Sequence, residues 1–155
     1  TFGRRVGEVV RRADGRSLGA FFREEIAGPL GADLHIGLAA AHDGRVAELV
    51  APPANPIAQA TAGRRASLFA RALANPPARP RDTALRQWRG AEIPAANGHG
   101  NARAIARLYA ALACGGTLDG VRLCGPETLA HASAVHASAP IGCCSCRCTG
   151  ASASS

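Results

Sequence analysis

The stretch from Asn101 to Gly116 constrains the fold of this chain more than any other segment. Large apolar residues recur there every three or four positions, which is the period of one face of an α-helix. This apolar stripe consists of Ile105, Leu108, Tyr109 and Leu112. Asn101 is a favoured N-cap residue, and Gly115-Gly116 can adopt the left-handed backbone that ends a helix. The sequence therefore predicts a helix after Asn101 with this stripe buried.

Two further helices are predicted near the N-terminus. The first spans Phe2–Arg12, ends at Asp14-Gly15, and has an apolar face made of Phe2, Val6, Val9 and Val10. The second begins at Ser17, whose side chain can cap the helix, and ends at Gly28-Pro29. Its buried stripe is predicted to be Leu18, Phe21, Phe22 and Ile26.

The remaining elements are shorter. Leu34–Leu38 is strand-like, and Arg45–Val50 is its predicted partner across a turn at Asp43-Gly44. Residues 51–66 are predicted to form a loop, followed by short helices at 66–74 and 82–88. Thr117–Leu123 is predicted to be a small hairpin or an extended turn, and Pro126 to begin a helix that runs to about His136. The predicted fold class is α+β, mainly helical.

Composition limits the core that this chain can build. Among 155 residues, Leu, Val, Ile and Phe together number 30, and Ala is far more common than any of them. This supply suffices only for a thin core, which fits a segment that packs on further chain. The sequence has no Met, so we expect an internal fragment rather than a complete reading frame.

The absence of Lys excludes several chemistries. No P-loop Lys, no Schiff-base Lys and no Lys that activates a serine can exist in these 155 residues. No cofactor is predicted. The spacing of His35, His42, His99, His131 and His136 does not match a metal site, and no metal ligands are predicted.

The chain has 18 Arg and no Lys against 11 Asp and Glu, which gives a net charge of +7. This charge raises an alternative function, a small Arg-rich module that binds nucleic acid or acidic partners. The arginines are scattered and lack interleaved aromatic residues, so GC-rich codon usage is the favoured explanation and nucleic-acid binding is not expected. No membrane span or signal peptide is predicted. The sequence slightly favours a cytoplasmic location and indicates no oligomeric state.

The last twenty residues differ in composition from the rest. Ile141 is their only large aliphatic residue, and we expect residues 135–155 to be a disordered tail. Cys143, Cys144, Cys146 and Cys148 could bind a soft metal, but the usual second pair of zinc ligands is absent. Out-of-frame translation of a GC-rich gene is the favoured explanation of this tail.

Two short motifs suggest chemistry. Gly15-Arg16-Ser17-Leu18-Gly19 matches the G-x-S-x-G nucleophile elbow, but that elbow follows a strand, whereas a charged helix is predicted here. We therefore interpret Ser17 as a helix cap. The loop Asn97-Gly98-His99-Gly100 leads into the best-predicted helix, and its glycines would let a ligand approach the backbone.

In combination, several stretches resemble the serine beta-lactamase-related hydrolases, which include class C beta-lactamases, penicillin-binding esterases and carboxylesterases. The resemblance covers residues 1–134, which we take as one partial domain. It lies in residues 2–19, 25–38, 93–112, 115–123 and 126–129. It implies a partial beta-lactamase/transpeptidase-like fold that lacks the nucleophile region and the late sheet strands.

The resemblance also implies a chemistry, namely acyl transfer through a serine ester. The family's Ser-x-x-Lys cannot occur in a chain without Lys, and its catalytic Tyr would fall just before Thr1. No catalytic residue is therefore carried over, and Tyr109 is assigned to the core. Asn97 and His99 are candidate cleft-lining residues. We expect a fragment of an esterase or beta-lactamase-like hydrolase from a GC-rich bacterium, acting on small esters or amides in its full-length form and inactive alone.

Overall fold

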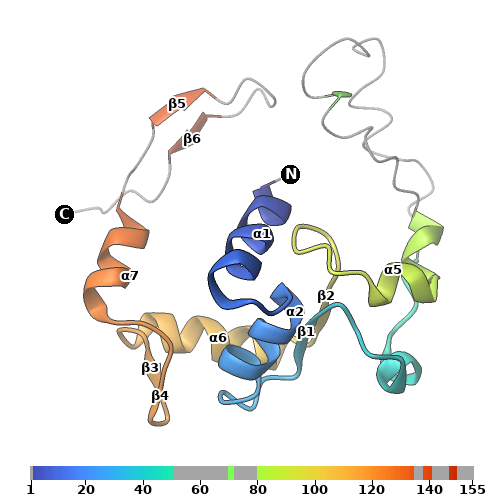
Figure 1. The fold of residues 1–155 in the computed structure, drawn as a ribbon, viewed down its shortest axis with the longest axis horizontal. Helices are drawn as coiled ribbons and strands as arrows, with labels where there is room; N and C mark the ends of the chain where they lie inside the picture. Colours follow the sequence, from blue (N-terminus) through green and yellow to red (C-terminus); the bar gives the residue numbers. More distant parts are fainter. Residues whose placement is uncertain (1, 51–69, 72–79, 135–137, 141–146, 150–155) are drawn as a thin grey trace. The chain divides into compact units, whose positions relative to one another are not determined.

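The computed structural model describes residues 2–50, 70–71, 80–134, 138–140 and 147–149 (Figure 1). The chain divides into two units. One comprises Thr1–Glu48 and Thr83–Leu129, and the other comprises Leu49–Asp82 and Ala130–Ser155. The first unit contains nearly all of the elements described below. Within the described residues, no helix has the length and apolarity needed to cross a bilayer.

The N-terminal helices form as the sequence predicts. Helix α1 spans Phe2–Asp14 and ends at Gly15, whose φ of 89° lies in the left-handed region that favours glycine. Helix α2 spans Leu18–Phe21, and the Ser17 hydroxyl oxygen accepts a hydrogen bond from the amide of Ala20 at 3.3 Å. The chain then continues as a π-helix, η1, over Phe22–Ala27.

The predicted strand forms, but its predicted partner is wrong. Strand β1 spans Leu34–Ile36 and pairs antiparallel with β2, Gly98–Gly100, so that His35 lies opposite His99. Residues Ala40–Arg45 form a 3-10 helix, η2, instead of leading into a hairpin. The Asp43 carboxylate forms an ion pair with Arg86, and this pair holds η2 against a segment more than 40 residues later in the chain.

The later elements are of the secondary-structure types that the sequence predicts. The 3-10 helix η3 spans Pro80–Ala84, α5 spans Arg86–Gly90, and α6 spans Ala102–Ala113. The Asn101 side chain caps α6 by accepting from the amide of Ala104 at 2.9 Å. Strands β3, Thr117–Leu118, and β4, Val121–Arg122, form the predicted hairpin. Its turn residues Asp119 and Gly120 both have positive φ, as a type I′ turn requires.

The core of the first unit is small and rich in alanine, as the composition predicts. Its buried members are Leu30, Ala32, Ala104 and Ala111. Partly buried residues around them include Ile26, Leu34 and Leu108. The stripe predicted for α6 is only partly correct, because Ile105 and Tyr109 are 46% and 65% exposed. The side of α6 that carries Ala104 and Ala111 is buried instead.

Helix α7 spans Pro126–Ser133, somewhat shorter than predicted. In the second unit, β5, Ser138–Pro140, pairs antiparallel with β6, Arg147–Thr149. Ala70 and Arg71 are helical, and the remainder of the helix predicted at 66–74 lies outside the described residues. The predicted domain limit near residue 135 and the predicted disorder of the tail remain predictions. The mainly helical α+β class is confirmed.

Candidate functional site

Asn97 is the only buried polar residue identified within the described part of the chain, with 3% of its surface exposed. Its Oδ1 accepts a hydrogen bond from the amide of Ile93 at 3.0 Å. Its Nδ2 donates to the carbonyl oxygen of Trp88 at 2.8 Å and also to that of Ala91. A buried amide needs such partners, and these three bonds fasten the loop before β2 to the end of α5.

His99 lies in β2 and is half-buried. Its Nδ1 lies 2.9 Å from the carbonyl oxygen of Asn97, so the histidine and the asparagine stabilise one loop. Across the strand pair, His35 Nε2 lies 3.0 Å from Asp33 Oδ1, and the ring centroids of His35 and His42 lie 5.1 Å apart. The structure therefore brings three histidines into one region that sequence spacing did not connect.

Asp33 connects the strand pair to its surroundings. Its carboxylate pairs with Arg45 and His35, and Asn101 Nδ2 lies 3.4 Å from Asp33 Oδ2. These contacts join β1, η2 and the start of α6. The Arg45 guanidinium, with a smaller contribution from His35, lowers the pKa of Asp33 below its usual value. The carboxylate is therefore ionised at neutral pH.

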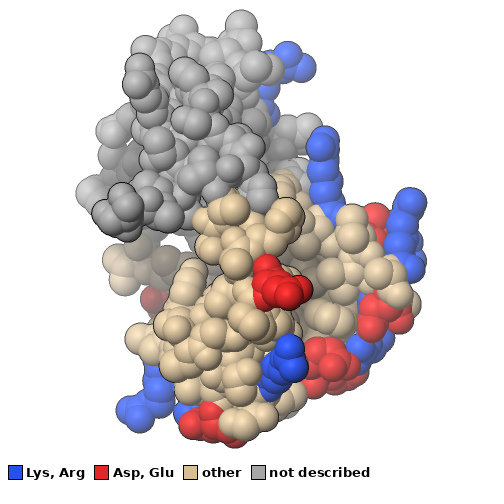
Figure 2. Space-filling view, turned by 90° about the vertical axis from the view of Figure 1, so that its left-hand side faces the viewer, with Lys and Arg blue, Asp and Glu red and all other residues tan. Residues whose placement is uncertain are grey.

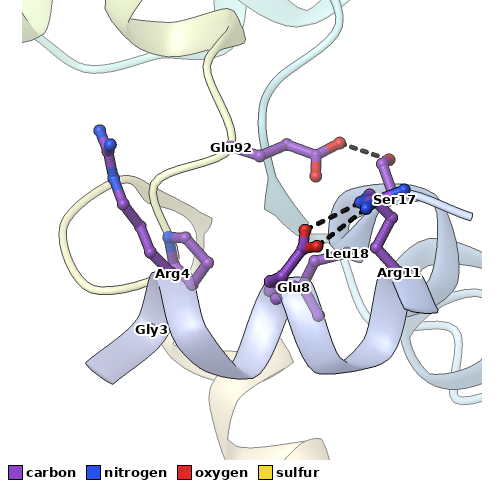
Figure 3. Close-up of a pocket in the computed structure, with 9 residues that line it drawn as sticks. Gly3, Arg4, Glu8, Arg11, Ser17, Leu18 and Glu92 are labelled. Carbon is purple, nitrogen blue, oxygen red and sulfur yellow. Dashed lines mark hydrogen bonds and ion pairs between the residues drawn. The ribbon is translucent and has the colours of Figure 1, made fainter. Parts of the chain in front are cut away.

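Glu92 links a second pair of segments. Glu92 Oε1 accepts a hydrogen bond from the Ser17 hydroxyl at 2.6 Å (Figure 3). Its Oε2 accepts a hydrogen bond from the amide of Gly19 at 2.9 Å. This carboxylate satisfies the amide of Gly19, one of the free amide groups at the start of α2. Ser17 is thus a cap with both of its hydrogen-bonding roles in use, preceded by helix α1 rather than by the strand of a nucleophile elbow.

A pocket of about 360 Å³ lies beside this junction (Figure 3). Gly3, Gly7, Leu18 and Pro94 contribute apolar or small lining groups, and its charged lining residues are Arg4, Glu8, Arg11 and Glu92. Glu8 accepts from Arg11 and Arg12 at 2.8 Å, and these two arginines lower its pKa to about 2. Asn97 and His99 are not among the residues that line this pocket.

The arginines of the first unit are largely matched by carboxylates. Arg16 has three carboxylate partners, Asp14, Glu24 and Glu25. Its guanidinium also lies over the ring of Phe21. These contacts raise the pKa of Arg16 and lower those of Asp14 and Glu24. Figure 2 shows blue and red side chains interspersed on the face in view.

The described residues contain no cluster of His, Cys, Asp and Glu that could hold a metal ion. Cys114 and Cys124 are free thiols, and Cys143, Cys144 and Cys146 lie outside the described residues. Sequence reasoning missed Asp33, Glu92 and the His35–His99 register. A carboxylate gives no periodic signal. Only the folded backbone brings together three pairs that are 60 or more positions apart, namely Ser17–Glu92, His35–His99 and Asp33–Asn101.

The amino-acid sequence of this chain matches a known family and a known relative. The beta-lactamase family model matches residues 1–140. The esterase/beta-lactamase LipL of Mycobacterium tuberculosis is 38% identical over 135 residues, which cover 82% of this chain and 32% of the relative. The chain therefore spans about a third of the length of the relative that it matches.

Two solved structures have a similar fold over about nine tenths of this chain. A family VIII carboxylesterase superposes with a TM-score of 0.75 at 38% identity, covering 91% of this chain and 36% of that one. A penicillin-binding protein homologue from Caulobacter crescentus gives 0.68 at 38% identity, covering 90% and 36%. The fold is therefore part of a beta-lactamase/transpeptidase-like fold. The chain belongs to the beta-lactamase-related serine hydrolase family.

Proposed function

We propose that this chain is a segment of a serine hydrolase that cleaves small esters or amides through an acyl-enzyme, and that the 155-residue chain alone is inactive. The observation that carries the proposal is the family match over residues 1–140, combined with a sequence that contains no Lys. Family membership supplies the reaction class. A chain without Lys cannot contain a Ser-x-x-Lys motif, so the proposal assigns that nucleophile to a part of the protein outside these 155 residues.

The geometry of the described residues supports a scaffolding role. Ser17 is bonded to a carboxylate and an amide, and Asn97 is bonded to three backbone groups. Both residues are fully used in holding loops and helix ends. We propose that residues 92–100 form part of the wall of the substrate cleft. His99 is half-buried and therefore more accessible to solvent than Asn97.

The Arg-rich binding module gains no support from the described surface. Six arginines each form an ion pair with a carboxylate, namely Arg11, Arg12, Arg16, Arg45, Arg86 and Arg107. An interface for phosphates needs cations that are available on one face, and these six arginines already contact neighbouring carboxylates.

The test is hydrolysis of p-nitrophenyl acetate and of nitrocefin by the purified chain. The proposal predicts rates equal to those of a heat-denatured sample. Saturable turnover that disappears on heating would show that the chain carries its own nucleophile and would overturn the proposal of inactivity.

A further inference from the structure

Asn97 is followed by Gly98, and an Asn-Gly pair can modify itself without an enzyme. The backbone nitrogen of the residue after an asparagine can attack the side-chain amide carbon, and glycine hinders this attack least because it has no Cβ. The sequence contains four asparagines. Asn55 and Asn75 precede proline, which has no N–H for this reaction, and Asn101 precedes alanine. Asn97 is therefore the asparagine of this chain with the most reactive neighbour.

The backbone does not require glycine at position 98. Gly98 is not among the glycines with positive φ in the described structure. A Cβ built at Gly98 meets no atom of the described residues within 4 Å, whereas a Cβ at Gly100 would lie 2.9 Å from the carbonyl oxygen of Asp33. An alanine at position 98 would therefore fit this part of the chain, and its Cβ would slow the attack on Asn97.

The closed loop restrains both groups that must react. The Asn97 side chain accepts a hydrogen bond from the amide of Ile93 and donates to the carbonyl oxygens of Trp88 and Ala91. The Asn97 amide donates to the carbonyl oxygen of Ile93 at 3.0 Å, and Gly98 is paired with strand β1. With 3% of its surface exposed, Asn97 is also shielded from water. Cyclisation therefore requires that the loop first opens.

We propose that Asn97-Gly98 is a deamidation site that the closed loop protects and that opening of the loop activates. In the open loop, the Gly98 nitrogen forms a bond to Asn97 Cγ while the Cγ–Nδ2 bond breaks. The proton of the Gly98 nitrogen passes to the departing Nδ2, which leaves as ammonia. Water then adds to one carbonyl of the cyclic imide and opens it to aspartate or isoaspartate. This reaction is independent of the proposed hydrolase function.

The product cannot hold the loop as asparagine does. A carboxylate has no N–H, so the carbonyl oxygens of Trp88 and Ala91 lose the donor that holds them. In the closed loop the ionised group would also lie buried against these two oxygens, which is energetically costly. Each deamidation therefore removes one chain from the closed state, and the extent of conversion records how often the loop has opened.

The experiment incubates the full 155-residue chain at neutral pH in buffer and, in parallel, in urea, and follows deamidation by mass spectrometry. The tryptic peptide 90–103 carries both Asn97 and Asn101, so the second asparagine is an internal reference. Circular dichroism confirms that the chain in buffer is folded. Variant G98A slows the chemical step. Variant G44A is the matched control, because a Cβ at Gly44 also meets nothing within 4 Å.

The proposal predicts that in urea Asn97 deamidates at least about tenfold faster than Asn101, and that folding slows deamidation of Asn97 at least about tenfold. In urea, G98A should slow deamidation of Asn97 by about tenfold and G44A should leave it unchanged. Equal rates at Asn97 in buffer and in urea, or a rate that G98A does not lower, would overturn the proposal. Variant N97D should melt below the parent chain, and an equal melting temperature would overturn the effect assigned to the product.

Discussion

Glu92 and Ser17, 75 residues apart in sequence, are joined by a hydrogen bond of 2.6 Å from the serine hydroxyl to the carboxylate. The other carboxylate oxygen accepts the amide of Gly19 at 2.9 Å. The serine of a G-x-S-x-G sequence is therefore part of a structural junction. This junction fixes the loop that precedes β2 to the start of α2.

Replacing Glu92 with Ala is expected to destabilise the first unit by about 1–2 kcal/mol, because two hydrogen bonds to a charged acceptor are lost near the surface. Urea denaturation followed by the fluorescence of Trp88, the only tryptophan, measures the change. Glu48→Ala is the matched control, since Glu48 is exposed and has no side-chain partner identified within the described residues. Equal midpoints for the two variants would contradict the role given to Glu92.

Gly19→Ala is expected to destabilise by about 1–3 kcal/mol through overpacking. A Cβ at Gly19 would lie 2.7 Å from Glu92 Oε1 and would also collide with the carbonyl oxygen of Ile36. At Gly44 the same substitution meets nothing within 4 Å, so Gly44→Ala serves as the control in thermal melts. If both variants melt together with the parent, the close approach at Gly19 is not present in solution.

Asn97→Ala is expected to cost about 2–3 kcal/mol, because the amide of Ile93 and the carbonyl groups of Trp88 and Ala91 lose their buried partner. Asn101→Ala removes only a helix cap and is expected to cost about 1 kcal/mol. Chemical denaturation of the two variants in parallel tests this order. A larger loss from Asn101→Ala would show that Asn97 is not the principal fastening of the loop.

Asp33 gives a pH-dependent prediction. Its pKa is lowered in the folded chain by Arg45 and then by His35, so its contribution to stability is present above the unfolded value of about 3.9. That contribution is lost as the pH falls toward the lower folded value. Asp33→Asn should therefore destabilise at pH 7, and its difference from the parent should shrink as the pH falls below about 3.9.

Melting temperatures at pH 7, 5, 3 and 2 measure this effect. Glu48→Gln provides a carboxylate control without an identified ion pair in the described part of the chain. An Asp33→Asn difference that stays constant from pH 7 to pH 2 would contradict the ion pairs assigned to Asp33.

Local patterns predicted the helices well because capping and periodicity act within a few residues. Asn101 and Ser17 cap the helices that the sequence assigned to them, and Asp119-Gly120 forms its turn. The partner of β1 could not be predicted in this way. Asp43-Gly44 is typical of a hairpin, but contacts from Arg86 to Asp43 and Leu38, 40 or more residues away, hold that segment in a 3-10 helix.

Burial was predicted less well than secondary structure. In α6 the small side of the helix, with Ala104 and Ala111, packs closely against Leu30, whereas the larger Ile105 and Tyr109 remain exposed. Hydrophobicity alone predicts that the larger residues are buried. Where two elements approach closely, however, only small side chains fit between them. For the site, the sequence singled out Asn97 and His99 without their partners, because hydrogen bonds from Asn97 to backbone groups depend on the folded loop.

The central claim is that this chain carries the architecture of a serine hydrolase family without its nucleophile. Intact-mass spectrometry after incubation with p-nitrophenyl acetate and, separately, with nitrocefin tests it directly. The account predicts that the folded 15.8 kDa chain keeps its unmodified mass. A stoichiometric acyl adduct on a serine, formed by the folded chain and not by the heat-denatured one, would contradict it.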